Sequence, residues 1–373
     1  MNYLDLRIDK IKNAVLSRAD AMLITADVTR QYAFGFASSA GYGYISAVRC
    51  ELYLDFRYFE KACVLQNCGK ISKYVKIKQI TAPRAKVLSE IIKADKTQKL
   101  LYEDRRMSCS EFEALKKELS AEAAEAELSA AGNAVDELRA CKDEYELGCI
   151  AEAQRITDLA FSHIVSYIRD GRRTGLGLRE CDIALELEYF MRKNGAGGIA
   201  FDTICVSGAK SSMPHGVPDE TVVSEGFLTM DFGARFDGYC ADMTRTLCIG
   251  NPDAEMKKIY DTVLEAQNSA FSKIRGGVKG KTVDSAAREI IYSAGFKGCF
   301  GHSTGHSLGL EIHESPNFSP NEETAVPAGA VVSVEPGIYI SGRFGVRIED
   351  IVFLTENGYK NLTNSTKEFI ILK

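Results

Sequence analysis

Apolar residues first recur at helical spacing and then gather in short strand-like runs over the N-terminal part of the chain. The helical spacing predicts an amphipathic helix over residues 3–17. Its apolar face consists of Leu4, Ile8, Ile11 and Val15. The other elements expected in this part are strands at 21–25, 44–48, 51–55 and 99–102 and a helix at 110–119. This mixture predicts a small α/β domain of about 130 residues, which is a normal domain size.

The C-terminal part shows one order of elements twice, with two helices followed by strands. The first copy has helices at 143–169 and 178–193 and strands near 202–207, 227–233 and 239–248. The second copy has helices at 252–275 and 283–294 and strands near 331–335 and 346–354. The repeated order predicts a duplicated α+β unit in which helices line the sheets. Because the two copies share no evident sequence identity, this prediction rests on the order of elements.

A segment rich in alanine, glutamate and serine, residues 119–135, separates the two parts. We place the domain boundary near its end, beside Gly132-Asn133, which predicts domains at 1–132 and 133–373. A chain of 373 residues has the usual length for two domains.

Charge and composition exclude several classes of protein. The chain has 46 basic and 51 acidic residues, a net charge of -5 and no block of lysine and arginine, which argues against a nucleic-acid partner. No apolar run approaches the length of a membrane span, and the first residues lack the apolar core of a signal peptide, so we expect no membrane partner. The 11 cysteines are scattered without a CxxC motif, which favours reduced thiols in a cytoplasmic protein.

The stretch LTMDFGARFDGYCADMTRT has the pattern of a β-hairpin with Asp237-Gly238 as its turn. This dipeptide favours a type I′ turn, and a turn centred there pairs Asp231 with Thr244. Asp242 then becomes the diagonal neighbour of Asp231 on one face, with Cα atoms roughly 7–8 Å apart. Two carboxylates aimed at one point repel unless they are protonated or bind a metal. A solvated hairpin with acidic residues is the alternative.

Four of the 5 histidines lie in two compact motifs. His215 is in MPHGVP, and His302, His306 and His313 are in GHSTGHSLGLEIHE. Histidine is the usual side chain for metal binding and for proton transfer near neutral pH. Alone, such a stretch could form a metal site of several kinds. We assign no role to the remaining histidine, His163, because a hydrogen-bonded structural histidine is the simpler interpretation.

Two acidic motifs follow the histidines. Glu335 ends an apolar run in SVEPG, just before a Pro-Gly turn. Arg347 and Glu349 are two residues apart in GVRIED and therefore share a strand face, opposite Val346 and Ile348. Taken alone, the second pair would indicate a surface salt bridge.

Together, the motifs resemble the family of aminopeptidase P, prolidase and methionine aminopeptidase, which has the "pita-bread" fold. They are PHGVP, DFG, DMTRT, HSTGHSLGLEIHE, VEPG and GVRIED. The resemblance covers nearly the whole chain: residues 136–373 resemble the catalytic domain, and the segment from Ala19 resembles the creatinase-type N-terminal domain. That extra domain implies the Xaa-Pro-specific branch. The expected fold is therefore an α+β pita-bread catalytic domain preceded by a smaller α/β creatinase-like domain.

The resemblance also implies two divalent metal ions. Asp231 would chelate one ion, Asp242 and Glu349 would bridge both, and His306 and Glu335 would complete the other. The four carboxylates balance the charge of two divalent ions. Four oxygen-bearing ligands and one imidazole make a fairly hard site, which suits Mn²⁺ and leaves Co²⁺ and Zn²⁺ as alternatives.

The resemblance assigns catalytic and substrate-binding roles to further residues. Glu335 is expected to carry protons beside the nucleophile. His215 and His313 are expected to hold the scissile carbonyl and stabilise the tetrahedral intermediate. His302 and Arg347 are expected to position the substrate, and Arg347 to orient Glu349 as well.

The implied activity is release of the first residue from peptides with proline in second position, as in an Xaa-Pro aminopeptidase. The alternatives are a prolidase, which accepts only Xaa-Pro dipeptides, a non-catalytic peptide-binding module on the same fold, and a metal-independent creatinase-like hydrolase. The resemblance also implies a homodimer in which the neighbouring N-terminal domain shapes the substrate pocket. Candidates for that role are Tyr32, Phe34, Arg57 and Tyr58.

Overall fold

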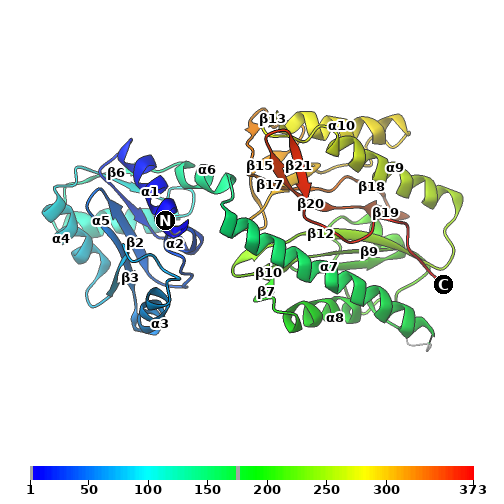
Figure 1. Ribbon diagram of the computed structural model, residues 1–373, viewed down its shortest axis with the longest axis horizontal. Coiled ribbons are helices and arrows are strands. Elements are labelled where there is room, and N and C mark those ends of the chain that lie inside the picture. Colours follow the sequence, from blue (N-terminus) through cyan, green and yellow to red (C-terminus); the bar gives the residue numbers. More distant parts are fainter. Residues whose placement is uncertain (1–2, 174–176) are drawn as a thin grey trace. The chain divides into compact units, whose positions relative to one another are not determined.

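The computed structural model describes residues 3–173 and 177–373 (Figure 1). The chain divides into two compact units, an N-terminal unit at Met1–Arg139 and a C-terminal unit at Ala140–Lys373. The division falls a few residues after the predicted boundary because helix α6 (Ala134–Ala140) contacts the N-terminal unit. Asp136 of α6 pairs with Arg105 and Arg106, at 3.5 and 3.1 Å.

The N-terminal unit is a six-stranded sheet with helices. In sheet order the strands are β4 (Lys76–Gln79), β3 (Cys50–Leu54), β2 (Tyr42–Ser46), β1 (Ala21–Ile24), β5 (Lys99–Tyr102) and β6 (Glu127–Ala130). The helices are α1 (Tyr3–Leu16), α2 (Asp27–Phe34), α3 (Phe56–Asn67), α4 (Arg84–Asp95) and α5 (Cys109–Ala121). The predicted strand pair is the antiparallel pair β2–β3. None of the residues of the edge strands β4 and β6 is fully buried, so their sequences lack the apolar run that revealed the central strands.

The C-terminal unit contains the helix pair α7 (Glu144–Arg173) and α8 (Glu180–Lys193) and the helix pair α9 (Ala254–Phe271) and α10 (Gly280–Ser293). Figure 1 shows the two pairs on opposite sides of the strands. One main sheet has the order β22 (Ile371–Leu372), β12 (Met243–Ile249), β9 (Gly226–Phe232), β8 (Ile204–Ser207). The other has the order β15 (Glu314–Phe318), β14 (Gly305–Ser307), β17 (Val331–Val334), β20 (Asp350–Thr355), β21 (Gly358–Asn361).

Besides these two sheets, shorter elements of the described chain form three small sheets and one 3-10 helix. They are β7 (Gly198–Ile199), η1 (Gly208–Ser212), β10 (Ala234–Phe236), β11 (Tyr239–Cys240), β13 (Val278–Lys279), β16 (Ala325–Val326), β18 (Gly337–Ile340) and β19 (Phe344–Arg347). The small sheets have the orders β11-β10-β7, β13-β16 and β18-β19. None of the described helices is long and apolar enough to cross a membrane.

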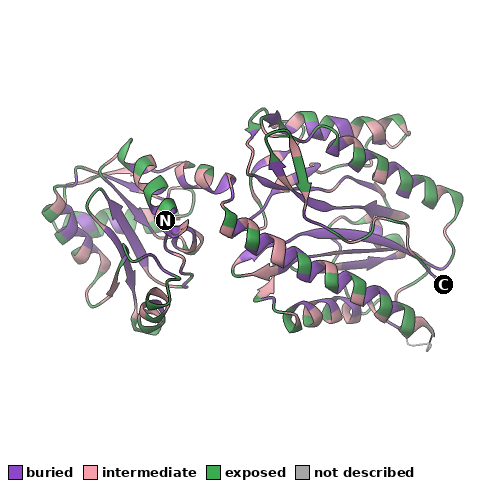
Figure 2. Cartoon of the chain, in the orientation of Figure 1, coloured by how far each residue is buried: buried purple, intermediate pink, exposed green. Residues whose placement is uncertain are grey.

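Each helix pair encloses its own hydrophobic core. Apolar residues of α7 and α8 pack with β9 and β12 in one core, and those of α9 and α10 pack with β17 and β20 in the other. Figure 2 shows the strands buried between helices whose outer faces are exposed. The predicted duplication of helices and strands is therefore confirmed, because each copy covers its own sheet with its own helix pair.

The predicted hairpin is also confirmed. Asp237 and Gly238 both have positive φ, at 47° and 89°, as a type I′ turn requires, and Thr244 pairs with Asp231. The predicted strand 239–248 is interrupted between β11 and β12, opposite Gly233. A Cβ at Gly233 would lie 1.9 Å from the carbonyl oxygen of Ala241, so only glycine permits this close approach of the two strands.

Candidate metal centre

One cavity of the C-terminal unit brings together all nine residues predicted to form the site. It has a volume of roughly 440 Å³. The predicted residues that line it are His215, Asp231, Asp242, His302, His306, His313, Glu335, Arg347 and Glu349. They come from both copies of the duplicated unit, so the cavity lies between the two main sheets.

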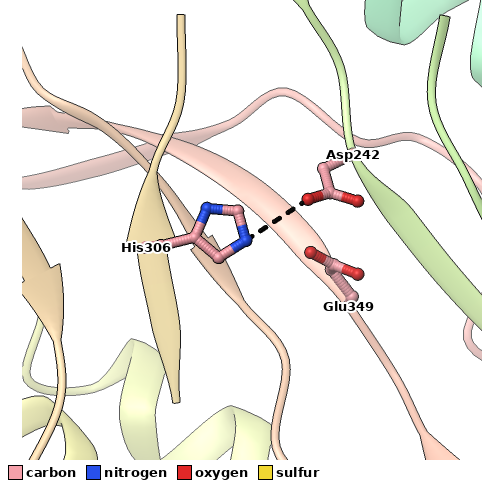
Figure 3. Close-up of side chains that lie close together, drawn as sticks. All are labelled: Asp242, His306 and Glu349. Atoms are coloured by element: carbon pink, nitrogen blue, oxygen red, sulfur yellow. Dashed lines mark ion pairs between the residues drawn. The ribbon is translucent and has the colours of Figure 1, made fainter. Parts of the chain in front are cut away.

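Three of these side chains converge closely enough to share one ion. Ligand atoms of Asp242, His306 and Glu349 all lie within 4.8 Å of one another. Figure 3 shows the imidazole and the two carboxylates pointing toward one point from different segments of the chain. His306 Nε2 lies 3.5 Å from Asp242 Oδ2 and 3.4 Å from Glu335 Oε1, which places Glu335 beside the same group.

The cavity concentrates negative charge in a buried place. Burial, and then the charges of Glu349 and Asp231, raise the pKa of Asp242 well above its usual range. Burial, and then the charge of Glu335, likewise raise the pKa of Glu349. Burial raises the pKa of Glu335 to about 7. Buried carboxylates at this density require protons or cations to neutralise them.

Two of the carboxylates keep one oxygen without a partner among the described residues. Asp231 Oδ1 and Glu349 Oε1 are buried and form no hydrogen bond. The other oxygens are held firmly, since Asp231 Oδ2 accepts from Arg347 Nη2 at 2.6 Å and Glu349 Oε2 accepts from Thr244 Oγ1 at 2.7 Å. One oriented and one unpartnered oxygen is the arrangement expected of metal ligands. The donor set of four carboxylates and one imidazole therefore fits divalent cations.

The ring of His306 is held in the orientation that a metal ligand needs. Its Nδ1 lies 3.2 Å from the Ser307 carbonyl oxygen and donates to it, which leaves the Nε2 lone pair directed at the carboxylates. Burial lowers the pKa of His306, so the neutral form is favoured. Ser333 Oγ accepts from the His306 amide at 3.0 Å and donates to Glu335 Oε1 at 3.1 Å, so one hydroxyl positions both residues.

His302 and Arg347 already use most of their polar atoms within the protein. His302 Nδ1 donates to the Ser303 carbonyl at 2.8 Å, and His302 Nε2 accepts from Tyr339 Oη at 2.9 Å. The side chain of Arg347 donates four hydrogen bonds, to Thr244, to the Pro214 carbonyl, to Tyr339 and to Asp231. A guanidinium has five N–H donors, so only one of those in Arg347 is left for another partner. Both residues line the cavity, and their role in positioning the substrate stays a prediction. Arg347 was also expected to orient Glu349, but the carboxylate that its side chain binds is that of Asp231.

Sequence reasoning missed Tyr339, which links these two residues. Its hydroxyl accepts from Arg347 Nη1 at 2.9 Å and therefore donates its own proton to His302 Nε2. Burial raises the pKa of Tyr339 to about 12, which keeps this proton in place. In the sequence, Tyr339 is marked only by its hydroxyl within the apolar run after VEPG, and this does not identify the hydrogen-bond partners of the hydroxyl.

His215 and His313, in contrast, form no side-chain hydrogen bond within the described part of the chain. His313 packs edge-to-face against His306, with ring centroids 4.4 Å apart. Burial lowers the pKa of His313, with a further contribution from His306. Two such rings on the cavity wall are available to a bound molecule.

The remaining predicted residues lie elsewhere. Tyr32 and Phe34 are buried in the core of the N-terminal unit. Arg57 pairs with Asp55 at 2.6 Å, and Tyr58 Oη lies 2.6 Å from Ser39 Oγ. The role expected of these four residues concerns the pocket of a neighbouring subunit and stays a prediction. His163 was assigned no role, and it pairs with Glu186 and stacks on Phe190.

Comparison with known proteins agrees with this geometry. The sequence model of Metallopeptidase family M24 matches residues 148–356, and that of the Creatinase/Prolidase N-terminal domain matches residues 7–141. A solved Xaa-Pro dipeptidase from Bacillus anthracis is 38% identical, with a TM-score of 0.91 over 99% of this chain and 100% of that chain. A solved X-Pro aminopeptidase from Thermotoga maritima is 35% identical, with a TM-score of 0.87 over 98% of this chain and 99% of that chain. The Xaa-Pro dipeptidase of Pyrococcus horikoshii is 34% identical over 98% of this chain and all of its own length.

Proposed function

The chain belongs to metallopeptidase family M24, and from this premise we propose that it is an Xaa-Pro dipeptidase, which hydrolyses the bond between the two residues of Xaa-Pro dipeptides. The expected creatinase-like N-terminal domain and pita-bread catalytic domain are confirmed, as is the metallopeptidase class. The choice of dipeptides departs from the aminopeptidase expected from the sequence. It is supported by the dipeptidase names of the Bacillus and Pyrococcus relatives.

The observation that carries the metal-dependent part of the proposal is the pair of unpartnered oxygens, Asp231 Oδ1 and Glu349 Oε1, among clustered carboxylates. Asp231, Asp242, His306, Glu335 and Glu349 would hold two divalent ions, and the hard donor set favours Mn²⁺. When bound, such ions neutralise the carboxylates, polarise the scissile carbonyl and acidify the attacking water.

The chain's own residues supply positioning and proton transfer. His215 and His313 line the cavity with unoccupied ring nitrogens and would donate to the carbonyl oxygen as negative charge develops there. The proline nitrogen carries no hydrogen in the peptide, so it must receive a proton to leave as an amine. The carboxylate of Glu335 would carry that proton. Arg347, fixed by its hydrogen bonds to Asp231 and Tyr339, keeps the adjacent wall rigid.

The test compares peptides of two lengths. The protein is stripped with a chelator and reloaded with Mn²⁺, and then given an Xaa-Pro dipeptide and an Xaa-Pro-Yaa-Yaa tetrapeptide. Cleavage of the dipeptide alone is the expected result. An Xaa-Ala dipeptide serves as the control for proline specificity, and Glu349→Gln serves as the control for the metal site.

The second candidate function is an Xaa-Pro aminopeptidase, favoured by the likeness to the Thermotoga enzyme. Release of the first residue from both peptides would establish it and refute the dipeptidase proposal. If neither peptide were cut with Mn²⁺, Co²⁺ or Zn²⁺, both proposals would fail and a non-catalytic peptide-binding role would lead.

The proposal includes a homodimer and a cytoplasmic location, both on the family resemblance. Sedimentation of the metal-loaded protein tests the dimer, since a monomer at micromolar concentration would contradict it.

A further inference from the structure

An ion pair on helix α10, between the buried Asp284 and the partly buried Arg288, belongs to none of the roles described above. Arg288 Nε and Nη2 donate to the two oxygens of Asp284, at 2.8 and 2.9 Å. Asp284 is only 1% exposed, whereas ion pairs between residues one turn apart on a surface helix are usually solvated. Burying this pair costs free energy unless its remaining donors and acceptors are satisfied.

Four further hydrogen bonds of the pair reach one short segment, Phe300–Thr304. Arg288 Nη1 donates to the Phe300 carbonyl and Nη2 to the His302 carbonyl, both at 2.9 Å. The guanidinium also lies over the Phe300 ring, 4.3 Å from its centroid. Asp284 Oδ1 accepts from the amide and the hydroxyl of Thr304, at 3.1 and 3.0 Å. Both ends of the segment are thus tied to the ion pair.

This segment has no helix or strand to fix its backbone, yet it adjoins the metal centre. His302 is within it, and His306 follows in β14. The Thr304 carbonyl accepts from the amide of Glu335 at 2.8 Å, so Thr304 also fixes the backbone of a predicted ligand. A displacement of the segment would therefore move His302, His306 and Glu335 together.

We propose that Asp284 and Arg288 are positioning residues for the metal centre. By holding the segment Phe300–Thr304, they keep the nearby ligands His306 and Glu335 and the wall residue His302 in place. A guanidinium suits this role because its planar fork reaches a carboxylate and two carbonyls at once, which a single ammonium does not. The inference rests on the proposed function, in that the same site is taken to bind metal.

The main test is Arg288→Met, with Arg343→Met as a matched control. Arg343 also binds a carboxylate with two nitrogens, at 3.0 and 2.7 Å from Glu255, and lies over a phenylalanine ring, that of Phe344, at 5.0 Å. None of its hydrogen bonds within the described residues reaches the cavity segment. Comparing the two variants thus separates the effect of losing an arginine from the effect of losing the contact with Phe300–Thr304.

Metal-stripped protein is titrated with Mn²⁺ alone by calorimetry, and kcat and KM for Xaa-Pro dipeptide are measured at saturating Mn²⁺, well below the melting temperature. Residues that orient metal ligands typically affect metal affinity or activity by 10–100-fold, so Arg288→Met should weaken Mn²⁺ binding or lower kcat by about that factor, with KM little changed. Arg343→Met should stay within about twofold of the wild type.

A purely structural role predicts a different result. Arg288→Met would then melt at a lower temperature while binding Mn²⁺ and turning over substrate as the wild type does, and the proposal would be overturned. Arg288→Lys retains the charge opposite Asp284 but not the fork, so it should recover thermal stability without recovering Mn²⁺ affinity. Recovery of full affinity by lysine would also overturn the proposal.

If Arg288→Met does not fold, Asp284→Asn tests the positioning role instead. The amide keeps an oxygen for Thr304 but loses the ion pair, so Mn²⁺ binding should weaken; wild-type affinity and kcat would refute the inference. Because the Mn²⁺ titrations need no substrate, they test the positioning role even if the wild type cleaves no Xaa-Pro peptide.

Discussion

The strongest quantitative prediction concerns Glu335 in metal-stripped protein. Burial raises the pKa of Glu335 from 4.5 to about 7, so the folded state holds this proton more tightly than the unfolded state does. The stabilising contribution is therefore fully present below the unfolded pKa and is lost as the pH rises through about 7. At about 1.4 kcal/mol per pKa unit, the whole contribution amounts to about 3 kcal/mol.

Glu335→Gln removes the titration while keeping the shape of the side chain. At a pH near 5.5 the glutamate is mostly protonated in the folded state and resembles glutamine, whereas near pH 8 it is ionised and destabilises the metal-free protein. The difference between the folded and unfolded pKa values of Glu335 then lowers the free energy of unfolding of the wild type by about 2 kcal/mol from the lower pH to the higher one. Relative to the wild type, the variant should gain that much free energy of unfolding as the pH rises.

The assay is urea unfolding of both proteins at the two pH values, with chelator present throughout. Groups far from Glu335 titrate alike in both proteins and cancel in the difference. The change in this difference with pH therefore reports Glu335 together with the side chains that it contacts, such as His306 at 3.4 Å. If the difference between variant and wild type stayed constant, or moved in the opposite direction, the reasoning about buried carboxylates would be refuted. Adding Mn²⁺ near pH 8 should stabilise the wild type more than the variant, which has lost a ligand.

Three further variants test the site and its surroundings. His313→Ala should lower kcat by about 10²–10³ while Mn²⁺ stoichiometry is retained, and unchanged kcat would exclude the predicted role in stabilising the carbonyl oxygen. Gly305→Ala would place a Cβ 1.8 Å from the Ser333 carbonyl oxygen. It should therefore cost about 3 kcal/mol or more in urea unfolding, and a loss below about 1 kcal/mol would contradict the packing argument. His163→Ala should cost about 1 kcal/mol, from its lost hydrogen bond to Glu186, and leave kcat/KM unchanged; a tenfold fall in kcat/KM would contradict a structural role.

Much of the fold was predictable because its signals are local. The Asp237-Gly238 turn fixed the hairpin register, since a type I′ turn needs positive φ at both residues and side chains alternate along the strands that follow. Helical spacing revealed the long helices in the same way. The edge strands β4 and β6 were missed because none of their residues is fully buried, so they carry no apolar pattern.

For the site, the sequence alone identified the residue types and, through family motifs, nine positions that line one cavity. It could not show which polar atoms are already satisfied. His302 and Arg347 were expected to position the substrate. Both line the cavity, but the tertiary structure gives most of their nitrogens to Ser303, Tyr339 and other protein groups. A motif fixes a residue's type and place in the chain, whereas its hydrogen-bond partner comes from a distant segment.

The sequence by itself therefore determined the elements, the hairpin register and the chemical character of the centre, because these follow from neighbours within a few residues. Only the tertiary structure decided that Asp231 Oδ1 and Glu349 Oε1 lack partners and that α10 holds the segment before His306. These features depend on contacts between residues far apart in the chain. Such contacts are fixed by the packing of the two helix-covered sheets around their cores, which no local pattern encodes.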